Sequence, residues 1–272
     1  MSGLFETVLV LSAIGFCITS VLLLVKPITV KKFPAGWQYC VWILVLLTML
    51  VPVYKLIPDS EVQRIQYITR IEVPGSETAI VENSDIAQQS PIINEQPSPV
   101  PKDVKVKIFD LLSIVWLCGT SIYLATVLIS YFVYILRKWQ NSDSAESVSV
   151  LDEVRKELGI RRNIKVRVSS EVGSPMLVGV VFPVIYMPHR EISPEMMRLV
   201  FLHELTHYKR KDLMIKWFAL FVNAVHWFNP MAYLLCANLS EACEISCDMK
   251  VTMDMGEEEQ RLYMKTILEL VE

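Results

Sequence analysis

The sequence predicts a mostly α-helical membrane protein in which three transmembrane helices are followed by an α+β domain. Apolar residues make up 53% of the 272 positions and charged residues 20%, and the mean hydropathy is +0.39. A soluble domain ordinarily carries more charge and fewer long apolar runs. After the last of three such runs, the pattern changes to shorter helical and alternating segments, as expected for a folded domain outside the bilayer.

The predicted spans are residues 5–25, 37–54 and 108–136, and each contains at most one charged residue. A helix needs about 20 apolar residues to cross the hydrocarbon core, so the second run is short for a span. The first run has neither the basic start nor the small-residue cleavage site of a signal peptide, so we expect it to be retained. Residues 1–55 therefore hold two spans.

Basic residues predict how these spans are oriented. Lys26, Lys31 and Lys32 lie in the short link between the first two runs, with no acidic residue among them. Short basic links stay in the cytoplasm, which predicts an outside N-terminus and a multi-pass protein of the cell membrane. Residues 56–107 then form an extracellular loop, predicted to be flexible by its Pro, Ser, Glu and Gln content. Residues 137–272 are cytoplasmic.

The cytoplasmic part has the pattern of an α+β domain. Its predicted elements are, in chain order, a helix at 151–158, strands at 164–169 and 178–187, and a helix through 198–208. Pro183 cannot donate to a strand ladder, which marks the second strand as an edge or bulged strand. Ser193 is a favourable N-cap and Pro194 a favourable first residue for the last helix.

The last helix carries the motif H-E-L-T-H, which places His203 and His207 four residues apart with Glu204 beside them. Histidines at this spacing share a helical face and can bind one Zn²⁺, while the glutamate can take a proton from water. The alternative is a surface helix with two solvated histidines. It fits poorly, because the preceding residues 199–202 are all apolar. The motif therefore predicts a zinc-dependent hydrolytic site.

A catalytic zinc needs a third protein ligand and one open position. Residues 238–249 form a predicted helix that contains Glu241, Glu244 and Asp248. Glu241 and Glu244 are one turn apart, so spacing alone leaves both open as the ligand. Asp248 lies one turn beyond Glu244 and can orient a ligand histidine through its second ring nitrogen.

The apolar residues 213–237 lie between the two halves of this site. A single crossing of the membrane would place His207 and Glu244 on opposite sides, and two crossings would need about 40 residues. The segment must therefore enter the membrane and return, or pack as a helical hairpin in the domain core. The dipeptide Asn229-Pro230 near its middle is a natural helix break.

The other residues of metal-binding types are expected to be structural. The six cysteines form no CxxC pair and none lies in the predicted loop, which predicts unpaired thiols rather than a cysteine zinc site or a disulfide framework. We expect His226 to be a core histidine rather than a fourth ligand, and His189 to lie on the surface.

Four stretches extend the pattern beyond the motif: SPMLVGVVFPVIYMP, HELTHYKRKD, HWFNP and, further on, E-x-x-C-D. Together they resemble the BlaR/MecR family of membrane metallopeptidases, which includes the β-lactam sensor-transducers. The resemblance implies a gluzincin-like zinc metallopeptidase domain with one Zn²⁺ per chain. The roles it implies are zinc ligands at His203, His207 and Glu244, a catalytic base at Glu204, and a histidine-orienting carboxylate at Asp248. It thus favours Glu244 over Glu241 as the third ligand.

The resemblance also implies a function. A bacterial membrane protein of this kind would be a metalloendopeptidase that transduces a signal by cleaving a cytoplasmic repressor, itself, or both. Its partners would be that protein substrate and the lipid bilayer. The net charge of −3 gives no reason to expect nucleic acid. Receptors of the family continue into a fourth span and a penicillin-binding-like sensor. The sequence contains no S-x-x-K followed by K-T-G, so we do not expect it to bind β-lactams directly.

Two alternatives stay open. One is a quality-control protease of the HtpX type, which shares H-E-x-x-H and a later glutamate but matches HWFNP and E-x-x-C-D less well. The other is a signalling or scaffold protein that holds zinc for structure alone. Glu204 argues against the second alternative, because a structural zinc site has no need of a base.

Overall fold

The computed structural model describes residues 2–52, 102–144 and 149–271, and most of these residues are helical. The elements are, in chain order, α1 (Ser2–Lys32), α2 (Ala35–Thr48), α4 (Lys102–Gln140), β1 (Asp143–Ser144), α5 (Ser149–Glu157), β2 (Lys165–Ser169), β3 (Met176–Val178), β4 (Val184–Pro188), α6 (Pro194–Arg210), α7 (Asp212–Val225), α8 (Pro230–Thr252) and α9 (Glu257–Val271). Residues 56–101 of the predicted loop lie outside the described residues. Residues 102–107 form the start of α4.

Two of the three predicted spans are long and apolar enough to cross a membrane. They are Gly3–Lys32 in α1 and Ile108–Gln140 in α4. Helix α4 exposes large apolar side chains such as Ile122, Leu128 and Phe132, as expected of a surface that faces lipid. Helix α2 has only 14 residues, about 21 Å at helical rise, which is less than the roughly 30 Å of a hydrocarbon core. The second span therefore stays a prediction.

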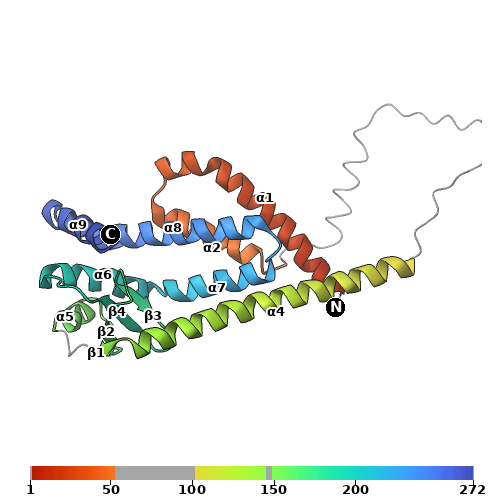
Figure 1. Ribbon diagram of the computed structural model, residues 1–272. Coiled ribbons are helices and arrows are strands. Elements are labelled where there is room, and N and C mark those ends of the chain that lie inside the picture. The colour runs from red at the N-terminus through yellow and green to blue at the C-terminus, as the bar shows by residue number, and fades with distance from the viewer. Residues whose placement is uncertain (1, 53–101, 145–148, 272) are drawn as a thin grey trace, which may run out of the picture.

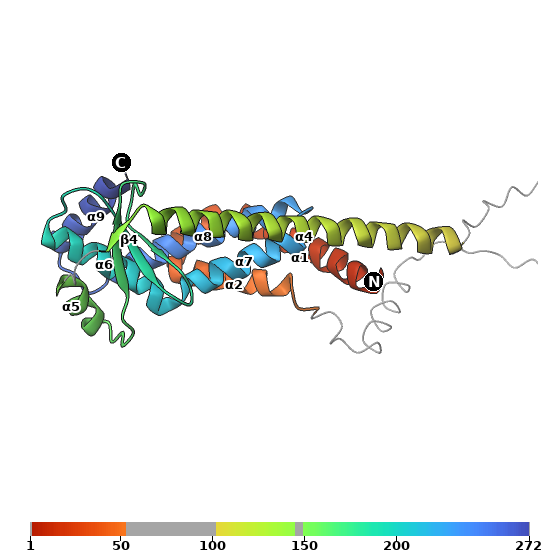
Figure 2. The same ribbon diagram turned by 60° about the horizontal axis from the view of Figure 1, so that its bottom comes forward.

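Helices α7 and α8 form a hairpin that extends from the α+β end of the molecule and lies along α1, α2 and α4 (Figures 1 and 2). The break between them falls at the predicted dipeptide. The Asn229 side chain accepts a hydrogen bond from the Met231 amide at 2.9 Å, and Pro230 is the first residue of α8. Helix α2 packs between the hairpin and α1, where Trp42 and Leu46 are buried against Leu235 and Leu239. A hairpin is one of the two forms the sequence predicted for residues 213–237.

Polar contacts hold the tip of this hairpin against the two candidate spans. The Asn229 amide donates to the Ser12 hydroxyl of α1 at 2.8 Å, and the Trp116 indole of α4 donates to the Val225 carbonyl at 2.8 Å. His226 is fully buried, and its Nε2 lies 2.9 Å from the Met49 carbonyl oxygen. His226 is thus a core histidine at the end of the hairpin opposite the H-E-L-T-H helix, as predicted.

The α+β end contains a four-stranded sheet in the order β1-β2-β4-β3. Strands β2 and β4 are parallel, and β3 and β4 form an antiparallel hairpin. The predicted single strand at 178–187 is therefore wrong. Pro183 has no amide hydrogen to pair, and Gly179 has a φ of +91°, where an added Cβ would meet the Phe182 carbonyl oxygen. These residues form the turn between β3 and β4. In the strand order β3 is one of the two edge strands and β4 lies inside the sheet.

Helix α6 begins at the residues its sequence indicates and continues two residues beyond the predicted end at 208, to Arg210. The Ser193 hydroxyl accepts a hydrogen bond from the Met196 amide at 3.3 Å, and Pro194 is the first helical residue. Lys211 ends the helix in the left-handed conformation, with a φ of 61°. One face of α6 joins the core formed with the sheet, α5 and α9, where Phe201 and Leu205 are fully buried. The caps fix the two ends of α6 and the core fixes one face. The remaining face carries the motif.

Candidate metal centre

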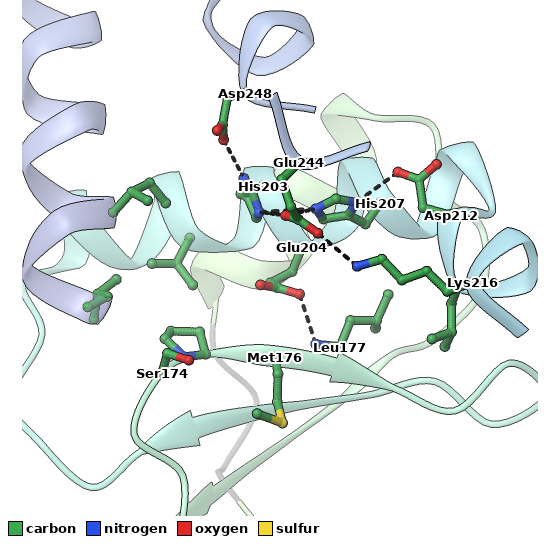
Figure 3. Close-up of a pocket in the computed structure, with 15 residues that line it drawn as sticks. Ser174, Met176, Leu177, His203, Glu204, His207, Asp212, Lys216, Glu244 and Asp248 are labelled. Carbon is green, nitrogen blue, oxygen red and sulfur yellow. Dashed lines mark hydrogen bonds and ion pairs between the residues drawn. The ribbon is translucent and has the colours of Figure 1, made fainter. Parts of the chain in front are cut away.

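The motif residues line a cavity of about 380 Å³ between α6, α7, α8 and β3 (Figure 3). The His203, Glu204 and His207 side chains enter it from α6, and Glu244 and Asp248 enter from α8. Residues 37 or more apart in sequence thus meet because α8 returns along α6 after the hairpin. The structure brings together all five residues that the sequence singled out.

The three predicted ligand side chains face one another. His203 Nε2 and His207 Nε2 are 3.1 Å apart, and Glu244 Oε2 lies 3.2 Å from His207 Nε2 and 3.8 Å from His203 Nε2. A tetrahedral ion with ligand bonds of about 2.1 Å separates its ligand atoms by about 3.4 Å. The donor set therefore fits one small divalent cation, and the side without a protein donor opens into the cavity.

Glu241, the alternative that spacing left open, is held elsewhere. Its carboxylate accepts a hydrogen bond from the Lys26 ammonium of α1 at 2.7 Å, and it does not line the cavity. The two glutamates are three residues apart, but the helix turns one toward α1 and the other toward α6. The geometry thus supports Glu244 as the third ligand.

Each histidine presents its other ring nitrogen to a carboxylate. His203 Nδ1 lies 3.2 Å from Asp248 Oδ1, as the sequence proposed, and 2.7 Å from the Tyr263 hydroxyl of α9, which donates to Asp248. His207 Nδ1 lies 2.8 Å from Asp212 Oδ2. A carboxylate can only accept, so it keeps the proton on Nδ1 and leaves the Nε2 lone pair for a metal.

Asp212 was missed by the sequence reasoning. It is the last residue of the HELTHYKRKD stretch, so the signal was present, but its role depends on the bend at Lys211 that turns it back toward His207. Its other oxygen, Oδ1, accepts from the Tyr39 hydroxyl of α2 at 2.9 Å, and Arg210 Nε lies 3.2 Å from Oδ2. Asp212 is only 1% exposed, so protein groups rather than water surround its carboxylate.

Glu204 lies beside the three donors without being one of them (Figure 3). Its Oε2 accepts a hydrogen bond from the Leu177 amide of β3 at 2.8 Å, which fixes the carboxylate in the cavity. Burial raises the pKa of Glu204 above its ordinary value, although the two neighbouring histidines oppose this. A carboxyl with a raised pKa is a better proton acceptor at neutral pH, which suits a general base.

The carboxylates around the cluster stabilise positive charge at the two histidines. Burial lowers the pKa of His203, but hydrogen bonds with Asp248 and Glu244 outweigh it and raise the pKa to about 10. The pKa of Glu244 is held below its ordinary value by the two histidines and by Lys216, against the effect of burial. Lys216 Nζ lies 2.7 Å from Glu244 Oε1 and so leaves Oε2 facing the histidines.

Cysteines also lie near the cluster. All six are unpaired, as predicted, and Cys243 and Cys247 are buried on α8 close to His207. The Cys247 thiol points to the His203 carbonyl oxygen at 3.8 Å, and neither cysteine lines the cavity. Glu244 is therefore the better third donor, because it faces both Nε2 atoms. His189 is exposed, as expected.

The chain is similar to known proteins along almost its whole length. The sequence model of the BlaR1 peptidase M56 family matches residues 5–272. The regulatory protein BlaR1 of Bacillus licheniformis is 25% identical over 261 residues, which cover 92% of this chain and 43% of that protein. The methicillin resistance mecR1 protein of Staphylococcus aureus is 24% identical over 270 residues, which cover 96% and 45%.

The chain thus spans less than half the length of these curated relatives. The family match includes α1 and α4, both candidate membrane helices, as well as the H-E-L-T-H helix and the returning helix α8. The resemblance to BlaR/MecR proteins that the four sequence stretches indicated is confirmed. The chain belongs to the BlaR1 peptidase M56 family.

Proposed function

We propose that the chain is a membrane-bound zinc metalloendopeptidase with a cytoplasmic-facing active site, which transduces a signal by cleaving a cytoplasmic repressor, itself, or both. The names of the relatives, a regulatory protein and a methicillin resistance protein, support a regulatory role. Membership of a peptidase family supports proteolysis over the alternative of a structural zinc protein. It also favours this family's activity over the HtpX-type alternative.

One observation carries the proposal. A half-buried glutamate with a raised pKa shares an open cavity with two histidine Nε2 atoms and a third carboxylate. A structural zinc site is closed by four protein ligands and needs no base. Here three donors leave one position open to the cavity, and Glu204 adjoins that position (Figure 3).

Each of these residues would have its own role in peptide hydrolysis. His203, His207 and Glu244 would hold the ion, which when bound supplies the Lewis acidity that polarises a carbonyl and acidifies a water. Glu204 takes the proton of the attacking water at its carboxylate and passes it to the amine that leaves. The Leu177 amide keeps Glu204 in place, and Lys216 pairs with the second oxygen of Glu244, which leaves the first oxygen for the ion that the site would hold.

The edge strand β3 suits an extended peptide substrate. It pairs with β4 on one side only, and its other side forms a wall of the cavity through Met176 and Leu177. A peptide can add to such an edge through main-chain hydrogen bonds. The sequence predicted the edge strand at 178–187, whereas the edge strand of the structure is Met176–Val178, so we propose Met176–Val178 as the peptide-binding strand.

We further propose that the α7–α8 hairpin enters the membrane from the cytoplasmic side and returns. Its tip contacts Ser12 and Trp116, which lie within the two candidate spans. If α1 and α4 cross the bilayer, the tip lies among them in the hydrocarbon. This arrangement keeps His207 and Glu244 on the same side, as the shared site requires.

Proteolysis is tested with Glu204→Gln, which keeps an oxygen for the Leu177 amide but cannot accept a proton. We expect the purified variant to retain metal while proteomics of expressing cells shows the loss of a cleaved cytoplasmic protein or of self-cleavage. Glu241→Gln is the matched control and should cleave like the wild type. Cleavage by Glu204→Gln at the wild-type rate would show that another group activates the water.

A further inference from the structure

A second cavity, outside the metal centre, lies between α4, the β3–β4 turn and the start of α7. Its volume is about 740 Å³, within the roughly 300–1,000 Å³ of ligand sites. The residues that line it are almost all apolar or aromatic, among them Phe132, Trp139, Val181, Phe182, Met214 and Trp217. Phe182 is 79% exposed and Val181 is 64% exposed, so the turn presents its apolar side chains outward rather than to the domain core.

A candidate membrane helix, α4, forms one wall of this cavity. Tyr131, Phe132 and Trp139 belong to Ile108–Gln140, and they form its wall on the side of α4. The β3–β4 turn and the first residues of α7 form the other walls, beside the C-terminal end of α4 (Figures 1 and 2). Trp139 and Tyr131 are aromatic residues of the type found at membrane interfaces. The surface that faces lipid on α4 thus extends onto the turn.

A basic cavity of about 360 Å³ adjoins the apolar one and shares Gly179, Val180 and Met214 with it. Its lining includes four exposed basic residues, Arg161, Arg162, Lys209 and Lys211. Among the described residues that line the two cavities, none is acidic. The Arg162 guanidinium donates to the Val181 carbonyl oxygen, so the basic loop and the apolar turn are joined.

We propose that an anionic phospholipid of the cytoplasmic leaflet binds across the β3–β4 turn. Its acyl chain occupies the apolar cavity against α4, and its phosphate meets the basic residues of the adjoining cavity. Arginine and lysine favour phosphate, and clusters of them next to a span attract anionic lipid. The proposal rests on the proposed membrane location and not on proteolysis. Strand β3 forms a wall of the metal-site cavity and leads into the turn that the lipid contacts. Bound lipid would therefore hold the edge strand in place.

The probe is phosphatidylglycerol with a photoactivatable diazirine near the end of one acyl chain, in vesicles that contain the purified full chain. Phosphatidylcholine with the same chain is the comparison. After irradiation, peptide mass spectrometry should find residues 180–182 labelled several-fold more by phosphatidylglycerol than by phosphatidylcholine. Ile122 and Leu128, which are exposed on α4, should be labelled equally by both lipids and report that the span is in the bilayer.

The headgroup contact is tested with Arg161→Gln combined with Lys209→Gln. This pair leaves the Arg162 bond to the turn intact. We expect phosphatidylglycerol labelling of residues 180–182 to fall to the phosphatidylcholine level. Lys250→Gln with Lys265→Gln removes the same charge from exposed positions on α8 and α9 and should change nothing. Added inorganic phosphate should not compete, because it lacks an acyl chain.

Three results would overturn the proposal. Labelling of Leu128 without labelling of residues 180–182 would show that the turn is outside the leaflet while the span is inside. Equal labelling by both lipids, unchanged in the charge variant, would exclude recognition of the anionic headgroup. Labelling of residues 180–182 that is lost for both lipids as the ratio of protein to lipid rises would make this surface a protein interface. None of these results bears on whether Glu204 supports peptide cleavage.

Discussion

His203 and His207 have matching surroundings, yet their two carboxylates are held differently. Each histidine turns Nε2 to the cavity and Nδ1 to a carboxylate, and each carboxylate accepts a hydrogen bond from a tyrosine hydroxyl. For His207 the carboxylate is Asp212, which is 1% exposed and also contacts Arg210. For His203 it is Asp248, whose side chain is 38% exposed.

Each histidine forms a branch of the site with its carboxylate and its tyrosine. The two tyrosines belong to different parts of the molecule. Tyr263 of the His203 branch is on α9, within the α+β core. Tyr39 of the His207 branch is on α2, which packs with α1 and the α7–α8 hairpin. Charge-assisted hydrogen bonds that are shielded from water are stronger than exposed ones. We therefore expect His207 to be the more rigidly held ligand and to be the one that senses a displacement of α2.

Removal of the histidines has the largest expected effect. With His203→Ala combined with His207→Ala, metal analysis of the detergent-purified protein should find no bound zinc, because only Glu244 would remain of the three donors. The wild type should hold one zinc per chain. Undiminished zinc in the double variant would show that neither His203 nor His207 is a zinc ligand.

Glu244 faces both branches, so its loss should follow next in size. We expect Glu244→Gln to weaken zinc binding by more than the roughly 10–100-fold typical of an outer residue. Competition with a chelator of known affinity measures this. Glu241→Gln, three residues away on the same helix, should bind zinc like the wild type, because Glu241 contacts Lys26 instead. Equal losses in both variants would contradict the placement of α8.

Substitution of the two outer carboxylates, Asp212 and Asp248, tests whether the more buried one holds its histidine more strongly. Asp212→Asn and Asp248→Asn should each weaken zinc binding by about 10–100-fold, with Asp212→Asn at the upper end because its charge is buried and has three partners. Thermal unfolding of the metal-free variants serves as the control for folding. If Asp248→Asn proved the more damaging in zinc affinity at equal stability, exposure would not govern the strength of these contacts.

The tyrosines should give the smallest effects. Tyr39→Phe and Tyr263→Phe each remove one hydroxyl, and a hydrogen bond to a charged group contributes about 1.5–3 kcal/mol, of which only a part reaches the metal. We expect a few-fold loss of zinc affinity in each. Because Tyr39→Phe keeps the aromatic ring beneath Arg210, a loss in this variant reports the hydroxyl alone. No change in zinc affinity would show that α2 does not act on His207.

Much of the fold follows from local sequence. Apolar length identified α1 and α4, the Ser193-Pro194 cap identified the start of α6, and Asn229-Pro230 marked the break between α7 and α8. These features depend on residues within a few positions of one another, which is why they can be predicted without tertiary contacts. The strand at 178–187 was mispredicted because its apolar run continues through a turn.

The motif by itself determined that two histidines and a glutamate share one face of a helix. Spacing left Glu241 and Glu244 equivalent, and only the family resemblance favoured Glu244. The tertiary structure shows the physical reason, because α8 is rotated so that Glu241 faces α1 and Glu244 faces α6. It also decided the roles of Asp212 and Tyr39, whose contact joins residues 173 apart. Such contacts depend on how whole helices pack, and helical periodicity along the chain does not record that packing.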